Sequence, residues 1–189
     1  MKMPKEKLIK EIIEWTLTIV IPVALALLIH TYLFTFARVD GTSMLDNFQS
    51  NNIMGVSRLY YRYNEPQRGE VITCYYDPPT GSLFKTRKLM VKRIIGLPGE
   101  TVEVKAGEVY IDGQALTETY LTRFDDRDFG PYTVGEDEIL VMGDNRPVSY
   151  DGRYIGPIPK DYIYGRVIFV ALPLNQIRST MDVPEYNLS

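Results

Sequence analysis

The sequence predicts a mostly β fold, in which antiparallel sheets form a barrel-like domain preceded by one N-terminal transmembrane helix. Three observations support this prediction. Residues 15–36 contain no Asp, Glu, Lys or Arg. Beyond residue 37, short runs rich in β-branched and aromatic residues alternate with Gly and Pro, which is typical of strands joined by turns. No long helical period interrupts these runs.

The N-terminal segment has the composition of a membrane anchor. As a helix, residues 15–36 span the roughly 30 Å hydrocarbon core of a bilayer. Lysines at positions 2, 5, 7 and 10 precede the span. The positive-inside rule therefore places residues 1–14 in the cytoplasm and the rest of the chain outside a cell membrane crossed once. A cleaved secretory signal and a soluble core helix are the alternatives, although the apolar stretch exceeds the roughly 7–15 residues of a signal core.

Residues 37–175 are predicted to form the extracytoplasmic β-rich domain, and residues 176–189 an exposed C-terminal tail. The runs that read as strands are 70–76, 89–95, 101–113, 138–143 and 166–172. Within 101–113, the residues Lys105-Ala106-Gly107 interrupt the alternation and predict a hairpin turn.

Composition excludes several classes of chemistry. The chain has one cysteine, Cys74, and one histidine, His30, which lies in the apolar stretch. An internal disulfide, a cysteine-based metal cluster and a histidine-based catalytic triad in the outer domain are therefore ruled out. The net charge of −3 does not suggest a nucleic-acid partner. No metal or cofactor is indicated.

Two cations interrupt the apolar run "LMVKRIIGLPGE" at residues 89–100. In a strand, Lys92 shares a face with Met90 and Ile94, because side chains alternate between faces. Burial on that face disfavours the ammonium and lowers the pKa of a lysine, as a general base requires. The alternative is a lysine that reaches water from an edge strand.

Three further stretches carry polar groups beside glycines: "VDGTSM" (39–44), "QRGEVI" (67–72) and "GDNRPVSYDGRYIG" (143–156). Gly41 permits a tight turn that presents Ser43, although such serines are usually simple turn residues. The two aspartates and two arginines of the third stretch predict a paired network that fixes the shape of the loop.

In this order, the four stretches resemble those of the bacterial type I signal peptidases, in their compact Gram-positive form with a single anchor. The resemblance extends from the anchor to about residue 172 and is most specific in "MVKRIIGLPGE" and "GDNRPVSYDGR". It implies a membrane-anchored serine protease in which Ser43 is the nucleophile and Lys92 the general base. No metal or cofactor is implied.

The resemblance also assigns supporting roles. Ser149 matches the serine that orients the lysine, and the Ser43 backbone N–H is expected in the oxyanion hole. Met44 and Gly41 are expected in the substrate cleft, and Arg93 is expected to pair with a carboxylate. The residues expected to hold the loop in shape are Asp144, Arg146, Asp151 and Arg153.

The sequence departs from the family pattern at three places. Asp46-Asn47-Phe48 replaces a Pro-Thr-Leu run after the nucleophile, and Asn51-Asn52 replaces a Gly-Asp pair. Gly152 occupies the usual position of a serine. These changes concern the shape of the nucleophile turn and of the cleft, and they fit a specialised relative with few substrates.

The expected function is removal of signal peptides from exported preproteins with small residues at the −1 and −3 positions. Membrane lipid is the second expected partner. The alternative is a narrowly specialised or non-catalytic chaperone that binds pilin or surface-protein precursors. A self-cleaving repressor of the LexA type shares the Ser/Lys chemistry, but the membrane anchor and the lack of a basic DNA-binding domain argue against it.

Overall fold

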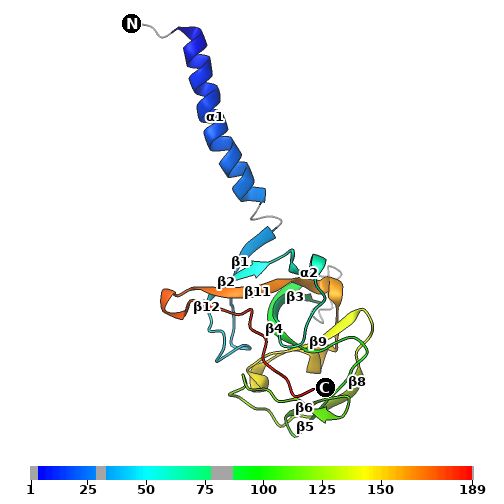
Figure 1. The fold of residues 1–189 in the computed structure, drawn as a ribbon. Coiled ribbons are helices and arrows are strands. Elements are labelled where there is room, and N and C mark those ends of the chain that lie inside the picture. Colours follow the sequence, from blue (N-terminus) through cyan, green and yellow to red (C-terminus); the bar gives the residue numbers. More distant parts are fainter. Residues whose placement is uncertain (1–3, 29–32, 78–86, 189) are drawn as a thin grey trace.

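The computed structural model describes residues 4–28, 33–77 and 87–188. The β strands form one body, and helix α1 (Lys5–Leu28) projects from it (Figure 1). His30 and residues 29–32 of the predicted span lie outside the described residues.

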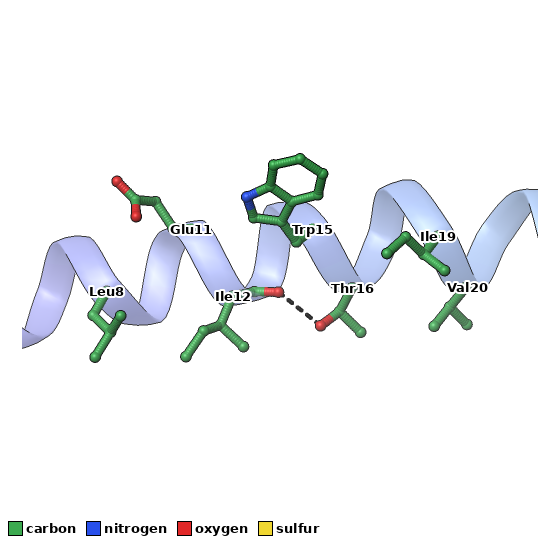
Figure 2. Close-up of a pocket in the computed structure, with 7 residues that line it drawn as sticks. All are labelled: Leu8, Glu11, Ile12, Trp15, Thr16, Ile19 and Val20. Carbon is green, nitrogen blue, oxygen red and sulfur yellow. Dashed lines mark hydrogen bonds between the residues drawn. The ribbon is translucent and has the colours of Figure 1, made fainter.

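Helix α1 is long and apolar enough to cross a membrane by length and composition. None of its described side chains is buried by the rest of the chain. The Thr16 hydroxyl donates a hydrogen bond to the Ile12 carbonyl (Figure 2), and Thr18 donates to Glu14 in the same way. Both hydroxyls are thus satisfied within the helix, as a hydrocarbon environment requires.

The boundaries of the predicted span differ from those of the helix. The helix begins at Lys5, before the predicted start at residue 15, and its described part ends at Leu28. Residues 34–36, which we expected in the span, belong instead to strand β1 (Phe34–Arg38). The antiparallel pairing of β1 with β2, the next strand in the sequence, decides this, because an apolar run of this length is compatible with either structure.

The larger sheet lies on the side of the body nearer α1 (Figure 1). Among the described residues it contains eight strands. Their order is β1 (Phe34–Arg38), β2 (Ile53–Ser57), β11 (Ile163–Leu172), β3 (Val71–Tyr76), β4 (Lys88–Gly96), β9 (Glu138–Met142) and β10 (Ile158–Pro159), with β12 (Arg178–Ser179) paired to β11.

The smaller sheet lies on the side away from α1 (Figure 1). Its order is β7 (Gln114–Ala115), β6 (Glu108–Ile111), β5 (Thr101–Lys105) and β8 (Phe129–Thr133). Short helical turns join the strands: α2 (Tyr60–Tyr63), η2 (Arg146–Val148), α3 (Gly152–Ile155), η3 (Lys160–Tyr162) and η4 (Leu174–Gln176).

The mostly β, antiparallel prediction is confirmed, since every ladder between described strands is antiparallel. The barrel-like expectation is corrected, because the sheets stay open. The five predicted strand runs all form strands, and 101–113 folds as a hairpin between β5 and β6. The strands β1, β2, β7, β8, β10 and β12 were not predicted, because their runs are short or lack a period of two.

One of three buried clusters positions the turn after β1. Met44 and Phe48 from that turn pack with Met54, Val56 and Val167 of the large sheet, and all five are buried. Burial of side chains of this size stabilises the folded state by about 1.5–3 kcal/mol each. The turn that carries Ser43 is therefore anchored on both sides by core residues.

The predicted exposed tail is also corrected. Residues 178–179 pair with β11, and Tyr186 packs against the cluster between the two sheets. Asn187 exchanges hydrogen bonds with the backbone of Thr117 and Ala115. The polar sequence of the tail concealed these contacts, which depend on partners far away in the chain.

Candidate active site

Ser43 lies on a tight turn that follows β1. Gly41 has φ +102°, a conformation that glycine adopts without the strain of a Cβ atom. The Ser43 carbonyl accepts a hydrogen bond from the Asn145 backbone N–H at 2.9 Å, and Asn145 Nδ2 donates to the Thr42 carbonyl at 2.9 Å. The turn is thereby fastened to the loop that follows β9.

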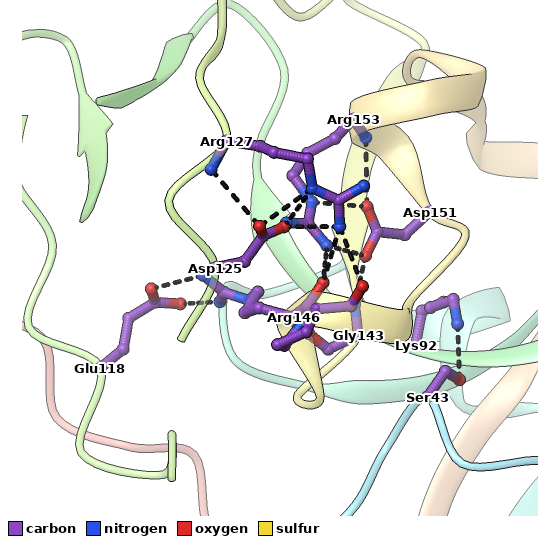
Figure 3. Close-up of polar contacts among 10 residues, drawn as sticks. Ser43, Lys92, Glu118, Asp125, Arg127, Gly143, Arg146, Asp151 and Arg153 are labelled. Carbon is purple, nitrogen blue, oxygen red and sulfur yellow. Dashed lines mark hydrogen bonds and ion pairs between the residues drawn. The ribbon is translucent and has the colours of Figure 1, made fainter. Parts of the chain in front are cut away.

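Lys92 comes from β4 and reaches this turn. Its Nζ lies 2.7 Å from Ser43 Oγ (Figure 3), although 49 residues separate the two in sequence. Lys92 is only 3% exposed, so its side chain does not reach water, although β9 pairs with β4 only from Arg93 onward. The alternative of a lysine that reaches water from an edge strand is therefore wrong.

Burial sets the protonation preference of Lys92. Loss of water contact lowers the pKa of its ammonium below the ordinary value, and this outweighs the opposing attraction of the Asp151 and Asp144 carboxylates. The lowered pKa makes the neutral amine, the form that can accept a proton from the neighbouring Ser43 hydroxyl, easier to reach. Burial also raises the pKa of the Cys74 thiol to about 12, which keeps that side chain protonated and unreactive.

A buried ionic network supports the loop beyond β9 (Figure 3). Asp151 accepts hydrogen bonds from the Gly143 backbone N–H at 2.9 Å and from Arg153 Nε at 3.0 Å. Burial alone raises the pKa of Asp151, but the Arg153 hydrogen bond and charge outweigh this and lower it. Arg153 also pairs with Asp125 at 2.7 Å, a carboxylate that the sequence analysis did not identify.

Asp144 and Arg146 belong to two different ion pairs. Asp144 accepts two hydrogen bonds from Arg93, which confirms the expected pairing of Arg93 with a carboxylate. Arg146 instead forms a two-point ion pair with Glu118, a second carboxylate missed from sequence (Figure 3). Glu118 and Asp125 belong to no short sequence motif. Only their ion pairs with the buried side chains of Arg146 and Arg153 identify them as members of this network.

The expected contact between Ser149 and Lys92 is not formed. Ser149 Oγ is buried and has no hydrogen-bond partner of good geometry among the described residues. It lies close enough to the Asp151 carboxylate to help lower the pKa of that group. The Ser149 side chain also leaves little room around Gly143, because a Cβ atom added there would lie 2.2 Å from its hydroxyl.

The departures from the family pattern are accommodated by specific contacts. Asp46 pairs with Arg123 at the surface, and Asn47 Nδ2 donates to Asp144 Oδ2 at 2.8 Å. Phe48 is buried, and so is Asn52, whose carbonyl accepts a hydrogen bond from the Val39 N–H. The nucleophile turn is therefore tied to the carboxylate that pairs with Arg93, the residue next to Lys92.

Gly152 leaves no space for a side chain. A Cβ atom there would lie 2.7 Å from the Val141 carbonyl oxygen and 3.1 Å from Leu140 Cγ. The close approach of α3 to β9 therefore requires glycine at this position.

A cavity of about 300 Å³ opens at the Ser43–Lys92 pair. Met44 and Gly41, the two residues expected in a substrate cleft, both line it. Tyr76, Met90 and Tyr150 contribute apolar surface, and the rings of Tyr76 and Tyr150 lie 6.1 Å apart. No group of three His, Cys, Asp or Glu side chains within the described ranges is arranged to hold a metal ion.

Comparisons with known proteins converge on one family. The family model for signal peptidases of peptidase family S26 matches residues 12–172. The signal peptidase I of Leptolyngbya laminosa is 36% identical over 179 residues, which cover 93% of this chain and 87% of the relative. Signal peptidase I S of Bacillus subtilis is 37% identical over 183 residues, which cover 90% and 95%. A solved signal peptidase I structure from Enterococcus faecalis matches 55% of this chain and 97% of its own, at 33% identity and a TM-score of 0.45.

Proposed function

This chain belongs to the signal peptidase family, peptidase S26, and on that premise we propose that it is a membrane-anchored serine endopeptidase that removes signal peptides. The observation that carries the catalytic assignment is the 2.7 Å contact between Ser43 Oγ and a buried lysine amine. Lysine replaces histidine as the base here, because the only histidine lies in the N-terminal apolar stretch.

The proposed reaction begins when Lys92 Nζ removes the hydroxyl proton of Ser43 as Oγ attacks the scissile carbonyl carbon. The tetrahedral intermediate collapses, the C–N bond breaks, and Lys92 returns the proton to the departing amine. Water then gives a proton to Lys92 and attacks the acyl-enzyme. Ser43 regains its proton when the ester bond to the signal peptide breaks.

The backbone N–H of Ser43 is proposed as an oxyanion donor, a type of group whose removal typically costs ~10²–10³-fold in rate. The hydrogen bonds that fasten the Ser43 and Thr42 carbonyls to Asn145 support this role, since they fix the peptide planes of the turn. A fixed donor needs no reorganisation when negative charge develops on the substrate oxygen.

Preprotein segments are proposed to bind in extended form along the outer half of β4. β9 pairs with β4 only from Arg93 to Gly96, so the other edge of residues 88–92 has no strand partner within the described part of the chain. The cavity borders this edge. Main-chain hydrogen bonds along such an edge would hold the peptide, and the shallow apolar walls would admit small side chains at −1 and −3.

Helix α1 is proposed as the single membrane anchor, with the N-terminus in the cytoplasm and the β domain outside. Lys5, Lys7 and Lys10 at its start support this orientation. Lipid would then surround the exposed apolar side chains of the helix. The enzyme would meet its substrates at the outer membrane surface, where signal peptides emerge.

A chaperone for pilin or surface-protein precursors remains the second candidate. The altered Asp46-Asn47-Phe48 segment favours it, whereas the hydrogen-bonded Ser43–Lys92 pair favours catalysis. The contacts of Asn47 and Phe48 support the peptidase further, because they hold the turn in place.

The test is cleavage of a preprotein with an A-x-A site by the full-length protein in detergent, with the products located by mass spectrometry. We expect cleavage after the second alanine, and loss of activity by at least ~10²-fold in Ser43→Ala and Lys92→Ala. Ser50→Ala and Lys105→Ala, at exposed positions, are the matched controls. Binding of precursors without cleavage would instead support the chaperone.

A further inference from the structure

The C-terminal segment from Gln176 to Asn187, called here the C-terminal strap, contacts the turn that carries Ser43 and also Gly69, whose carbonyl accepts a hydrogen bond from Arg93 of β4. We propose that this strap positions Ser43 against Lys92, by holding the nucleophile turn at one end and the surroundings of β4 at the other. The proposal rests on the proposed function. The strap lies beyond the residues matched by the family model, which end at 172.

The first end of the strap holds the nucleophile turn. Arg178 Nη2 donates a hydrogen bond to the Asn47 carbonyl, and its guanidinium lies 5.3 Å from the centre of the Phe48 ring. Gln176 accepts a hydrogen bond from Asn52 Nδ2 at 3.0 Å and donates one to Gln49 at 3.0 Å. One arginine and one glutamine therefore contact four residues of the segment that follows Ser43, namely Asn47, Phe48, Gln49 and Asn52.

The middle of the strap is fixed to β11. The Thr180 backbone N–H donates to the Ile168 carbonyl at 3.0 Å, and its hydroxyl donates to the Val167 carbonyl at 2.8 Å. Arg166, which is buried, donates to the Met181 carbonyl at 2.8 Å. The path of the strap is thus set by the large sheet rather than by its own sequence.

The second end of the strap supports the neighbour of Lys92. Tyr186 and Val183 pack directly on Gly69, where an added Cβ atom would lie 2.6 Å from the tyrosine oxygen. The Gly69 carbonyl accepts a hydrogen bond from Arg93 Nη1 at 2.8 Å. The strap therefore packs against Gly69, whose carbonyl oxygen holds the guanidinium of Arg93, the residue next to Lys92.

The end of the strap reaches the smaller sheet. Asn187 accepts a hydrogen bond from the Thr117 N–H and donates one to the Ala115 carbonyl, each at 2.8 Å. The red segment in Figure 1 accordingly runs from β12 on the large sheet toward the small sheet. The strap thus joins the large sheet, through β11, to the small sheet, through Ala115 of β7.

Both ends act on groups that meet at Asp144. This buried carboxylate accepts hydrogen bonds from Asn47 Nδ2 and from Arg93. The strap holds Asn47 through Arg178 and holds Arg93 through Gly69. Release of either end would let the turn and β4 move relative to each other, and a displacement of about 1 Å in a catalytic pair can cost ~10²-fold in rate.

The experiment compares Arg178→Ala and Tyr186→Ala with two controls in the full-length chain. Tyr186→Phe keeps the ring and removes only a buried hydroxyl that has no partner among the described residues. Glu185→Ala changes an exposed strap residue. We expect a kcat about tenfold to a hundredfold lower in the two alanine variants, with KM near wild type, and wild-type values in the controls.

A substrate-free measurement separates this proposal from the proposed function. Competitive labelling of amines at a series of pH values, read by mass spectrometry, reports the titration midpoint of Lys92. Loosening the site admits water, so the midpoint should move upward toward 10.5 in both alanine variants. Thermal unfolding identifies any variant that fails to fold, and Arg178, which is exposed, can be replaced without opening a core cavity.

Folded Arg178→Ala and Tyr186→Ala proteins with the wild-type labelling midpoint would overturn the proposal, whether or not the wild type cleaves precursors. A wild type that cleaves nothing, but whose Lys92 midpoint depends on the strap, would refute only the proposed function. Equal effects of Tyr186→Phe and Tyr186→Ala would also contradict the packing argument, since phenylalanine keeps the ring atoms beside Gly69 and loses only the hydroxyl.

Discussion

Arg93 and Asp144 form a buried two-point ion pair, with Arg93 Nε 2.9 Å from Asp144 Oδ1 and Nη2 2.6 Å from Oδ2. The side chains are 7% and 1% exposed. Arg93 follows Lys92 in the strand, and Asp144 also accepts from Asn47 of the nucleophile turn. One ion pair therefore connects the two segments that carry the proposed catalytic pair.

Replacement Arg93→Ala should strongly destabilise the fold. It leaves the Asp144 carboxylate buried without its counter-ion, a change that typically costs about 3–5 kcal/mol of the free energy of unfolding. Urea unfolding monitored by circular dichroism measures the loss. Arg123→Ala, which breaks the exposed pair with Asp46, is the control and should stay near wild type. Equal losses in both variants would contradict the role of the buried pair.

The pH dependence of cleavage should follow the titration of Lys92. Only the neutral amine accepts the Ser43 proton, so kcat/KM should rise with pH as Lys92 loses its proton. Because burial lowers the pKa of Lys92, the midpoint of this rise should lie below 10.5. Initial rates on a fixed precursor, measured between about pH 5 and about pH 10, give the profile. This pH range is about as wide as folded proteins commonly tolerate. A rate that still rises about tenfold per pH unit at the upper limit of this range would contradict the assignment of Lys92 as a desolvated base.

Replacement Lys92→Met should stabilise the folded protein at low pH. A lysine whose pKa is lower in the folded than in the unfolded state binds fewer protons when folded, so its contribution to stability rises with pH. Methionine removes the burial penalty, and its stabilising effect should be largest below the folded pKa and vanish above 10.5. Thermal unfolding at several pH values tests this. Lys105→Met, at an exposed site, should show no gain that grows as the pH falls.

Replacement Gly152→Ser, which introduces the residue usual in the family, should destabilise this chain. The new Cβ atom would lie 2.7 Å from the Val141 carbonyl oxygen, a backbone atom that cannot turn aside. Forced overpacking of this kind typically costs about 1–3 kcal/mol. Gly135→Ser is the matched control, because its nearest neighbour is the flexible Glu138 carboxylate. Unfolding midpoints that agree for the two variants would refute the steric explanation.

Local sequence patterns predicted the longer strands. The apolar residues around Lys92 predict a strand, because alternation is set by neighbours along the chain, but they left open whether its amine is buried or reaches water. The same holds for β3 and β9, whose residues were predicted almost to their ends. The pairing of Ser43 with Lys92 came from family resemblance, since no local pattern relates residues 49 positions apart.

The tertiary structure alone decided the partners of the charged residues and the path of the chain ends. Arg146 pairs with Glu118 rather than with its neighbour Asp144, and Tyr186 packs on Gly69 instead of lying in solvent. Residues 34–36 form a strand because β2 offers a free edge, although their composition also suits a membrane helix. The physical reason is the same in each case. An ion pair or a docked ring depends on the distance between side chains in space, and loop geometry sets that distance independently of the local pattern.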